Sequence, residues 1–451
     1  MLTREDNELL TRTGPGTPAG ELWRRFWVPA LMDWELPEPD CPPVRVKLLG
    51  EDLVAWRDST GKVGLIAANC PHRGASLFFG RNEEQGLRCV YHGWKFDTSG
   101  ACLDMPNEPP ESNFKHKIKA TAYPTHEAGG VIWTYMGPAG ETPGQAGAPT
   151  LHAGVPDFPK LGWTLLPEDH RYVSKFHVEC NYLQATEGDI DNSHVPFAHG
   201  SVNPDRSLSF LDRVRRTKVT ITGQEEVSFY TKDLHPRGII IDKDYGILMG
   251  WRRDIGDKYS WHINHWFLPH STVMAAAPPD SLLSNLRVPM DDENSWQFRI
   301  RWNPYRPLGA EEVRSYREDG LFFPDLVPGT FRCKENIDND YLIDRELQRT
   351  RSVTGIKSQT QQDRAVNETM GRIYDRTKEH LGTADAVIIA MRRRMVKAVR
   401  DLQQGREPYA ATHGEIFMQV PVDLEMAKDV PFEEGARDWI TGAKAAVPLG
   451  R

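Results

Sequence analysis

The sequence predicts an α+β protein with two domains, a small all-β domain followed by a larger mixed domain. Short β-type runs separated by glycine turns fill residues 44–138, and a linker rich in glycine and proline follows at 139–150. From 151 to 451, strand-like runs alternate with helical stretches. At 451 residues the chain is too long for one ordinary hydrophobic core, which favours the same division.

Along the chain, residues 1–43 begin with a short helical pattern and continue into a proline-rich extension. The expected strands of the all-β domain are VRVKLLG, LVAWRD, VGLIAAN, LRCVYHGWKFD and GGVIWTYMG. Those of the second domain are WTLLPE, YVSKFHVEC, RVRRTKVTITG, YSWHINHWFLP and SWQFRIRW. The strongest helix signal is DAVIIAMRRRMVKAVRDL, where apolar residues recur with a 3.6-residue period: Val387, Ile388, Met391, Met395, Val399 and Leu402.

Composition is that of a globular protein, with 39% hydrophobic and 26% charged residues. The net charge of −8 argues against a general affinity for nucleic acid. No apolar run is long enough for a membrane span, and the polar N-terminus lacks the apolar core of a signal peptide. Six cysteines show no spacing typical of a disulfide framework, so we expect a cytoplasmic protein in a reducing compartment.

Two short motifs carry the most specific chemistry. Cys70-Pro-His72-Arg-Gly is a C-x-H loop, and Cys89-Val-Tyr-His92-Gly-Trp is a C-x-x-H loop. Two thiolates and two imidazoles suit a [2Fe–2S] cluster with cysteines on one iron and histidines on the other, the Rieske arrangement. Because neutral imidazoles replace two thiolates, the potential rises to roughly −150 to +300 mV. Such a cluster is an electron relay.

A structural zinc site is the alternative for these four residues, since Cys₂His₂ also suits tetrahedral Zn²⁺. Zinc modules usually take two ligands of one kind from each knuckle, as in C-x₂₋₄-C and H-x₃₋₅-H. Here each loop mixes one cysteine with one histidine, which favours the cluster.

A second metal site is predicted in Glu187-Gly-Asp-Ile-Asp191-Asn-Ser-His194-Val-Pro196-Phe-Ala-His199. On a helix, Asp191 and His194 would share one face. Pro196 would kink or end that helix, so that His199 can converge on His194. Two histidines and one carboxylate form the facial triad of non-haem Fe(II) oxygenases. A capped, solvated helix is the other interpretation of this acidic segment.

With both motifs in place, nearly the whole chain, about 1–430, resembles the large (alpha) subunit of Rieske non-haem iron ring-hydroxylating oxygenases. The late segment Gln361-Gln-Asp363-Arg-Ala-Val-Asn-Glu368, together with the residues up to Leu381, resembles the phthalate dioxygenase and aryl O-demethylase subgroup. The resemblance implies a Rieske domain followed by a helix-grip (START-like) catalytic domain. It also implies that Asp363 is the third iron ligand, where spacing alone leaves Glu368, Asp375 and Asp385 open.

The resemblance further implies a homotrimer or a hexamer of stacked trimers, in which Asp191 bridges His194 to His72 or His92 of a neighbouring subunit. A helix cap is the alternative role for Asp191. The chain lacks a G-x-G-x-x-G dinucleotide motif, so a separate NAD(P)H-dependent reductase is expected, with a flavin and a plant-type [2Fe–2S] cluster. O₂ would be the co-substrate.

The expected reaction is hydroxylation or O-demethylation of an aromatic carboxylate, with cis-dihydroxylation as the alternative. An arginine would hold the carboxylate, and Arg206, Arg213, Arg215 and Arg216 follow the iron segment. We take Arg206 and Arg213 as the candidates, and a surface charge is the alternative role of each. A Rieske electron-transfer protein without oxygenase activity is an alternative of another class, but it needs only about a hundred residues and no second iron.

Overall fold

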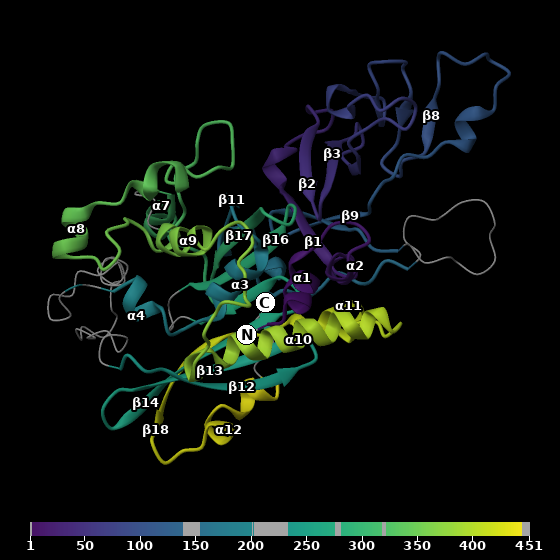
Figure 1. Ribbon diagram of the computed structural model, residues 1–451. Coiled ribbons are helices and arrows are strands. Elements are labelled where there is room, and N and C mark those ends of the chain that lie inside the picture. The colour runs from purple at the N-terminus through teal and green to yellow at the C-terminus, as the bar shows by residue number, and fades with distance from the viewer. Residues whose placement is uncertain are drawn as a thin grey trace.

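The structure, a computed structural model, describes residues 2–138, 154–200, 202, 233–275, 281–317 and 322–443. An N-terminal all-β domain packs on a larger domain built around one eight-stranded sheet (Figure 1). This confirms the predicted α+β class and the order of its two parts. The expected linker, 139–150, lies outside the described residues.

Three small sheets form the N-terminal domain. Helices α1 (Arg4–Thr11) and α2 (Pro18–Trp23) precede it. Its strands are β1 (Trp27–Met32), β2 (Val44–Leu48), β3 (Glu51–Arg57), β4 (Val63–Ala67), β5 (Arg81–Glu83), β6 (Gly86–Arg88), β7 (Lys95–Phe96), β8 (Cys102–Asp104), β9 (Thr125–Ala128) and β10 (Val131–Tyr135). Strand β1 comes from the expected extension and pairs with β10, so the extension completes one of the sheets.

The large sheet has the order β11-β17-β16-β15-β14-β13-β12, with β18 paired to β14, and every pairing in it is antiparallel. Its strands are β11 (Arg171–Val178), β12 (Arg237–Lys243), β13 (Gly246–Asp254), β14 (Lys258–Phe267), β15 (Ser271–Met274), β16 (Leu282–Pro289), β17 (Ser295–Trp302) and β18 (Val422–Ala427). The helices around it are α3 (Tyr182–Ile190), α4 (Val195–Ala198), α7 (Ala310–Arg317), α8 (Arg345–Thr350), α9 (Gln359–Thr369), α10 (Ala386–Gln403), α11 (Tyr409–Thr412), α12 (Phe432–Gly435) and α13 (Arg437–Ile440).

The expected strand WTLLPE is wrong. Residues 162–165 form a 3-10 turn, because Thr164 bonds back to the Leu161 carbonyl through both its backbone nitrogen, at 2.9 Å, and its hydroxyl, at 2.7 Å. The predicted strand RVRRTKVTITG lies outside the described residues.

The two faces of the large sheet have different partners. On one face, Trp296 of β17 donates to the Lys47 carbonyl at 3.1 Å, and Lys175 of β11 donates to the Ala30 carbonyl at 3.3 Å. That face holds the N-terminal domain. The other face carries α3, and α10 lies beside β12 and β13. The predicted apolar stripe of α10 is confirmed, since Val387, Met391, Met395 and Val399 are buried. Among the described residues, no helix is both long and apolar enough to span a membrane.

Candidate metal centres

The two Cys/His loops of the N-terminal domain have matching backbones. In each, the cysteine N–H donates to the carbonyl five residues on, from Cys70 to Ala75 and from Cys89 to Trp94, at 2.8 Å. The glycine four residues after each cysteine donates back to the cysteine carbonyl, at 2.9 and 3.0 Å. Both glycines have φ near +75°, the left-handed region that favours glycine. The motif spacing therefore encodes two similar tight loops.

The ligand atoms of these loops separate into two pairs. Cys70 and Cys89 are each 2% exposed and belong to the apolar core of the domain, and burial raises the pKa of the Cys70 thiol to about 11. His72 and His92 are partly exposed, with ring centroids 4.5 Å apart. His72 also stacks on Trp94 at 4.2 Å. Thiols lie inside and imidazoles outside, as a cluster with two distinct irons requires.

Two observations bear on the zinc alternative. A single ion would need at least three of these ligand atoms close together, but among the described residues only His194, His199 and Asp363 form such a group within 4.8 Å. The buried Nδ1 of His92 has no hydrogen-bond partner among the described atoms, as a nitrogen available to a metal would. The four residues fit a dinuclear cluster better than zinc.

The second site begins where α3 ends. Asp191 is the C-cap of α3, and its Oδ1 accepts bonds from the backbone and hydroxyl of Ser193, at 2.7 and 2.6 Å. His194 is the N-cap of α4, and His199 is its C-cap. The expectation of one helix bearing Asp191 and His194 is therefore wrong. Pro196 lies in the first turn of the new helix, where a missing N–H costs nothing.

Helix α9 brings the third residue of the site. Asp363 Oδ1 lies 3.0 Å from His199 Nε2 and 3.5 Å from His194 Nε2. Gly188 favours the close approach of α3 to α9, because a Cβ there would lie 3.1 Å from Asn367 Nδ2 and would have to displace that side chain. Two imidazoles and one carboxylate, with no fourth ligand to the group among the described residues, could hold a ferrous ion and leave positions open.

Both imidazoles are oriented by a second hydrogen bond. His194 Nδ1 lies 3.3 Å from Asp191 Oδ2, and His199 Nδ1 lies 2.6 Å from Gln362 Oε1. Each bond turns Nε2 toward Asp363, and within the described part of the chain the buried Nε2 of His199 has no hydrogen-bond partner. A ligating histidine typically donates its other N–H in this way.

Charges at the site are strongly coupled. Burial opposes the protonated form of His194, but hydrogen bonds to Asp191 and Asp363 outweigh it and raise the pKa to about 10. Burial also opposes the charged form of Asp363, yet His199 and His194 hold its pKa well below the usual range. Without a metal, the site therefore keeps a negative carboxylate facing a proton that a cation would replace.

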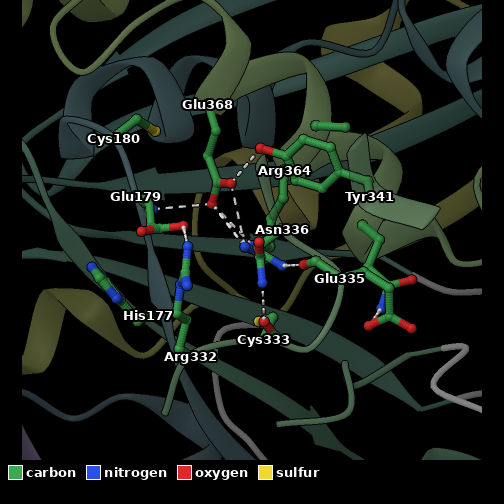
Figure 2. A network of polar contacts seen from close by, with 12 residues as sticks. His177, Glu179, Cys180, Arg332, Cys333, Glu335, Asn336, Tyr341, Arg364 and Glu368 are labelled. Atoms are coloured by element: carbon green, nitrogen blue, oxygen red, sulfur yellow. Dashed lines mark hydrogen bonds and ion pairs between the residues drawn. The ribbon is translucent and has the colours of Figure 1, made fainter. Parts of the chain in front are cut away.

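The competing carboxylates have other partners. Glu368, on α9, bonds Tyr341 at 2.5 Å and pairs with Arg364 at 3.0 Å (Figure 2). Its Oε1 also accepts from the Glu179 N–H. This buried network holds α9 in place. Asp375 bonds Thr377, and Asp385 bonds the Gly382 N–H. Glu187 is paired with Arg376 and Arg392, at 2.8 and 2.7 Å.

The candidate substrate arginines, Arg206 and Arg213, lie outside the described residues. Two residues of this region were not found from the sequence. Gln362 orients His199, and its only signal was its place next to Asp363. The other is Arg299, a buried arginine on β17, in a run for which the sequence predicted a strand and no role in the site.

One chain thus contains two donor sets, a Cys₂His₂ pair of loops that suits an electron-relay cluster and a His₂Asp group that suits an open ferrous site. Residues 26–124 match the Rieske [2Fe-2S] domain family, and residues 150–424 match the family described as "LigXa C-terminal domain like". The chain belongs to the Rieske non-haem iron oxygenases, as an oxygenase subunit. Its cofactors are a [2Fe–2S] cluster and a mononuclear iron, and O₂ is its co-substrate.

Relatives with established names cover most of the chain. It is 35% identical to the 3-chlorobenzoate-3,4-dioxygenase oxygenase subunit of Comamonas testosteroni, over 89% of each chain. It is 36% identical to the phthalate 4,5-dioxygenase oxygenase subunit of Pseudomonas putida, over 90% of this chain and 88% of that one. It is 30% identical to the 5,5'-dehydrodivanillate O-demethylase oxygenase subunit of Sphingobium sp. (strain NBRC 103272 / SYK-6), over 91% of this chain and 83% of that one.

Among solved structures, dicamba monooxygenase bound to dicamba has the same fold, with a TM-score of 0.55. The sequences are 18% identical, and the match covers 85% of this chain and 99% of that one.

Proposed function

We propose that Cys70, Cys89, His72 and His92 hold the [2Fe–2S] cluster and that His194, His199 and Asp363 hold the mononuclear iron. The convergence of these last three residues within 4.8 Å carries the proposal. When bound, the two centres supply the electrons and the O₂ reduction needed to insert oxygen into a substrate. Asp191 and Gln362 hold the two imidazoles so that each Nε2 faces Asp363.

The places of the two sites support electron transfer between subunits. Figure 1 shows β2, β3 and β8 of the Rieske domain on the opposite side of the molecule from α4. Exposed apolar side chains surround both sites, namely Phe79, Val90 and Tyr91 at the cluster loops and Phe197, Val202, Val353 and Val366 around the iron. Apolar patches of this kind mark interaction surfaces. A head-to-tail homotrimer, or a hexamer of two stacked trimers, would bring these two apolar surfaces together and place His72 or His92 near Asp191 of the next subunit.

An aromatic carboxylate is the proposed substrate, with hydroxylation or O-demethylation as the reaction and cis-dihydroxylation as the alternative. Relatives named for chlorobenzoate, phthalate and dehydrodivanillate support this class. They are named oxygenase subunits, which supports a separate reductase. For that partner we propose an NAD(P)H-dependent protein with a flavin and a plant-type cluster. An electron-transfer protein would have no need of the His₂Asp site.

Single-turnover product analysis tests this function. The chemically reduced protein would be mixed with ¹⁸O₂ and a panel of phthalate, 3-chlorobenzoate and dehydrodivanillate. Label in a diol or phenol, or methyl released as formaldehyde, supports the oxygenase and identifies the reaction. If the protein with both metals bound forms no product from any acid, the aromatic-acid function is wrong. Three irons and two sulfides per chain would still support the two centres.

A further inference from the structure

Arg299 is a buried cation for which the described residues supply no partner. It lies on β17 and is 2% exposed. Within that part of the chain its side chain makes no hydrogen bond and no ion pair, and its Nε is buried and unbonded. Other arginines nearby are engaged: Arg287 binds Asp189 at 2.8 Å, and Arg301 donates to the Ser281 carbonyl at 3.2 Å.

The strand register places Arg299 on the iron side of the sheet. It faces Asn285 on β16 and Ser174 on β11, and cross-strand neighbours point to the same face. Asn285 donates to Asp189 of α3 at 2.8 Å, so this is the face that α3 covers. Asp363, on α9, also acts electrostatically on Arg299. Arg299 therefore projects from the face of the sheet that α3 covers, and Asp363 is close enough to act on its charge.

Charge at this place is not balanced once a metal is bound. Asp189 is already paired with Arg287. A divalent ion at His194, His199 and Asp363 would be balanced by the carboxylates of Asp363 and Asp191, so that neither carboxylate would remain as a counter-charge for Arg299. Burial already lowers the pKa of Arg299 to about 10, which still leaves it charged at neutral pH. A buried charge without a counter-charge is expensive, so an anion is needed.

Further unbonded donors lie on the same face. Thr272 on β15 faces Asn285, and Trp266 on β14 faces Thr272. Both are at most 1% exposed, and among described atoms Thr272 Oγ1 and Trp266 Nε1 lack hydrogen-bond partners. Buried donors are normally satisfied, so Thr272 and Trp266 have hydrogen-bonding capacity that the described residues do not use.

We infer that Arg299 binds the carboxylate of the aromatic acid, with Thr272 and Trp266 lining the same side of the substrate. A guanidinium can hold a carboxylate with two parallel hydrogen bonds, which fixes the orientation of the ring as well as its position. The anchored ring would then face the iron ligands on α9 and α4. This inference rests on the proposed function and assigns its specificity for acids to Arg299.

The test is calorimetric titration of the oxidised, metal-loaded protein under anaerobic conditions. Each acid, phthalate or 3-chlorobenzoate, is compared with its neutral amide in wild type, Arg299→Gln and Arg299→Lys. Arg252→Gln is the matched control, because Arg252 is on β13, on the opposite face of the sheet from Arg299, and its guanidinium lies 4.1 Å from the ring centroid of Tyr259. Unfolding curves and the cluster absorbance show whether each variant is folded.

Arg299→Gln should weaken binding of the acid by on the order of 10- to 100-fold, because a charge-assisted bond is lost, and should leave the amide nearly unaffected. Arg299→Lys keeps the positive charge but loses the paired N–H donors of the guanidinium. Its affinity for the acid should therefore lie between those of wild type and Arg299→Gln. If Arg299→Gln does not fold, the acid and amide affinities of Arg299→Lys provide the test. Acid binding equal to wild type in the folded variant would overturn the role of Arg299 while leaving the proposed function intact. If wild type neither binds nor oxidises any acid, both are wrong.

Discussion

Gln362 Oε1 accepts a hydrogen bond from His199 Nδ1 at 2.6 Å, while the Gln362 amide nitrogen donates to the Ile356 carbonyl at 2.8 Å. The second bond decides which end of the amide faces the imidazole. Because an oxygen faces it, Nδ1 carries a hydrogen, which leaves Nε2 as the nitrogen that can bind a metal beside Asp363. One buried glutamine thus fixes the tautomer of one candidate iron ligand.

Gln362→Met should reduce iron affinity by about 10- to 100-fold, because methionine cannot accept the His199 hydrogen bond. Mononuclear iron per chain, measured after dialysis at a series of free Fe²⁺ concentrations, reports this directly. The cluster absorbance gives the chain concentration and should not change.

Gln361→Met is the matched control on the same helix turn. Gln361 is equally buried, but it bonds Ser358 and Glu335 instead of a histidine. Its loss should lower stability and leave the iron titration unchanged. Equal iron affinities in wild type and Gln362→Met would show that Gln362 does not position His199.

Asp191→Asn should slow electron transfer by about 100-fold or more and leave both metals bound. The amide can no longer accept from both His194 and an imidazole of a neighbouring subunit as a charged carboxylate does. Rapid mixing of the reduced protein with substrate and O₂, followed at the cluster absorbance, measures the rate.

Ser193→Ala is the control, since it removes the hydroxyl bonded to Asp191 Oδ1 and leaves Oδ2 on His194. If instead Asp191 only caps α3, Asp191→Asn would turn over at the wild-type rate, and its only effect would be on stability.

The sequence predicted best those features that depend on neighbours along the chain. The cluster loops, the apolar stripe of α10 and the pairing of His194 with His199 all follow from local spacing. One detail differs, since Pro196 lies in the first turn of a new helix where a kink in a single helix was expected. Asp363 needed the family resemblance, because its distance from Glu368 on the same helix says nothing about which faces α3. Only the tertiary contacts of Glu368 with Tyr341 and the Glu179 N–H decide it.

Arg299 and Gln362 could not be found from the sequence for the same reason. In SWQFRIRW, alternation predicts one apolar face, Phe298 and Ile300, and a polar face that water would normally cover. In the structure α3 covers the polar face. Arg299, which the alternation predicts at the surface, is therefore buried. Burial by a distant segment is invisible to local periodicity.

Asp363→Asn and Glu368→Gln should have opposite effects. Asp363→Asn should lose the mononuclear iron, so that metal analysis gives two irons and two sulfides per chain in place of three and two. Glu368→Gln should retain three irons but unfold more easily, because Arg364 loses its buried partner. If Glu368→Gln lost the mononuclear iron and Asp363→Asn kept it, the carboxylate ligand would be Glu368 and not Asp363.

Glu187→Gln should lower the free energy of unfolding by about 3 kcal/mol at pH 7, because it leaves the buried Arg376 and Arg392 without their shared carboxylate. Both metals should stay bound. Burial alone would raise the pKa of Glu187, but the two arginines outweigh it and hold that pKa below its ordinary value of 4.5. Its stabilising effect is therefore complete at neutral pH and is lost as the pH falls below that value.

Urea unfolding of wild type and Glu187→Gln from pH 7 to pH 3 measures this effect. The difference between them should narrow as the pH drops, because the wild-type carboxylate becomes protonated. Glu8→Gln, which removes an exposed pair with Arg12, should cost under about 1 kcal/mol at every pH. A difference that stays constant with pH would mean that the charge of Glu187 contributes nothing to holding α3 against α10.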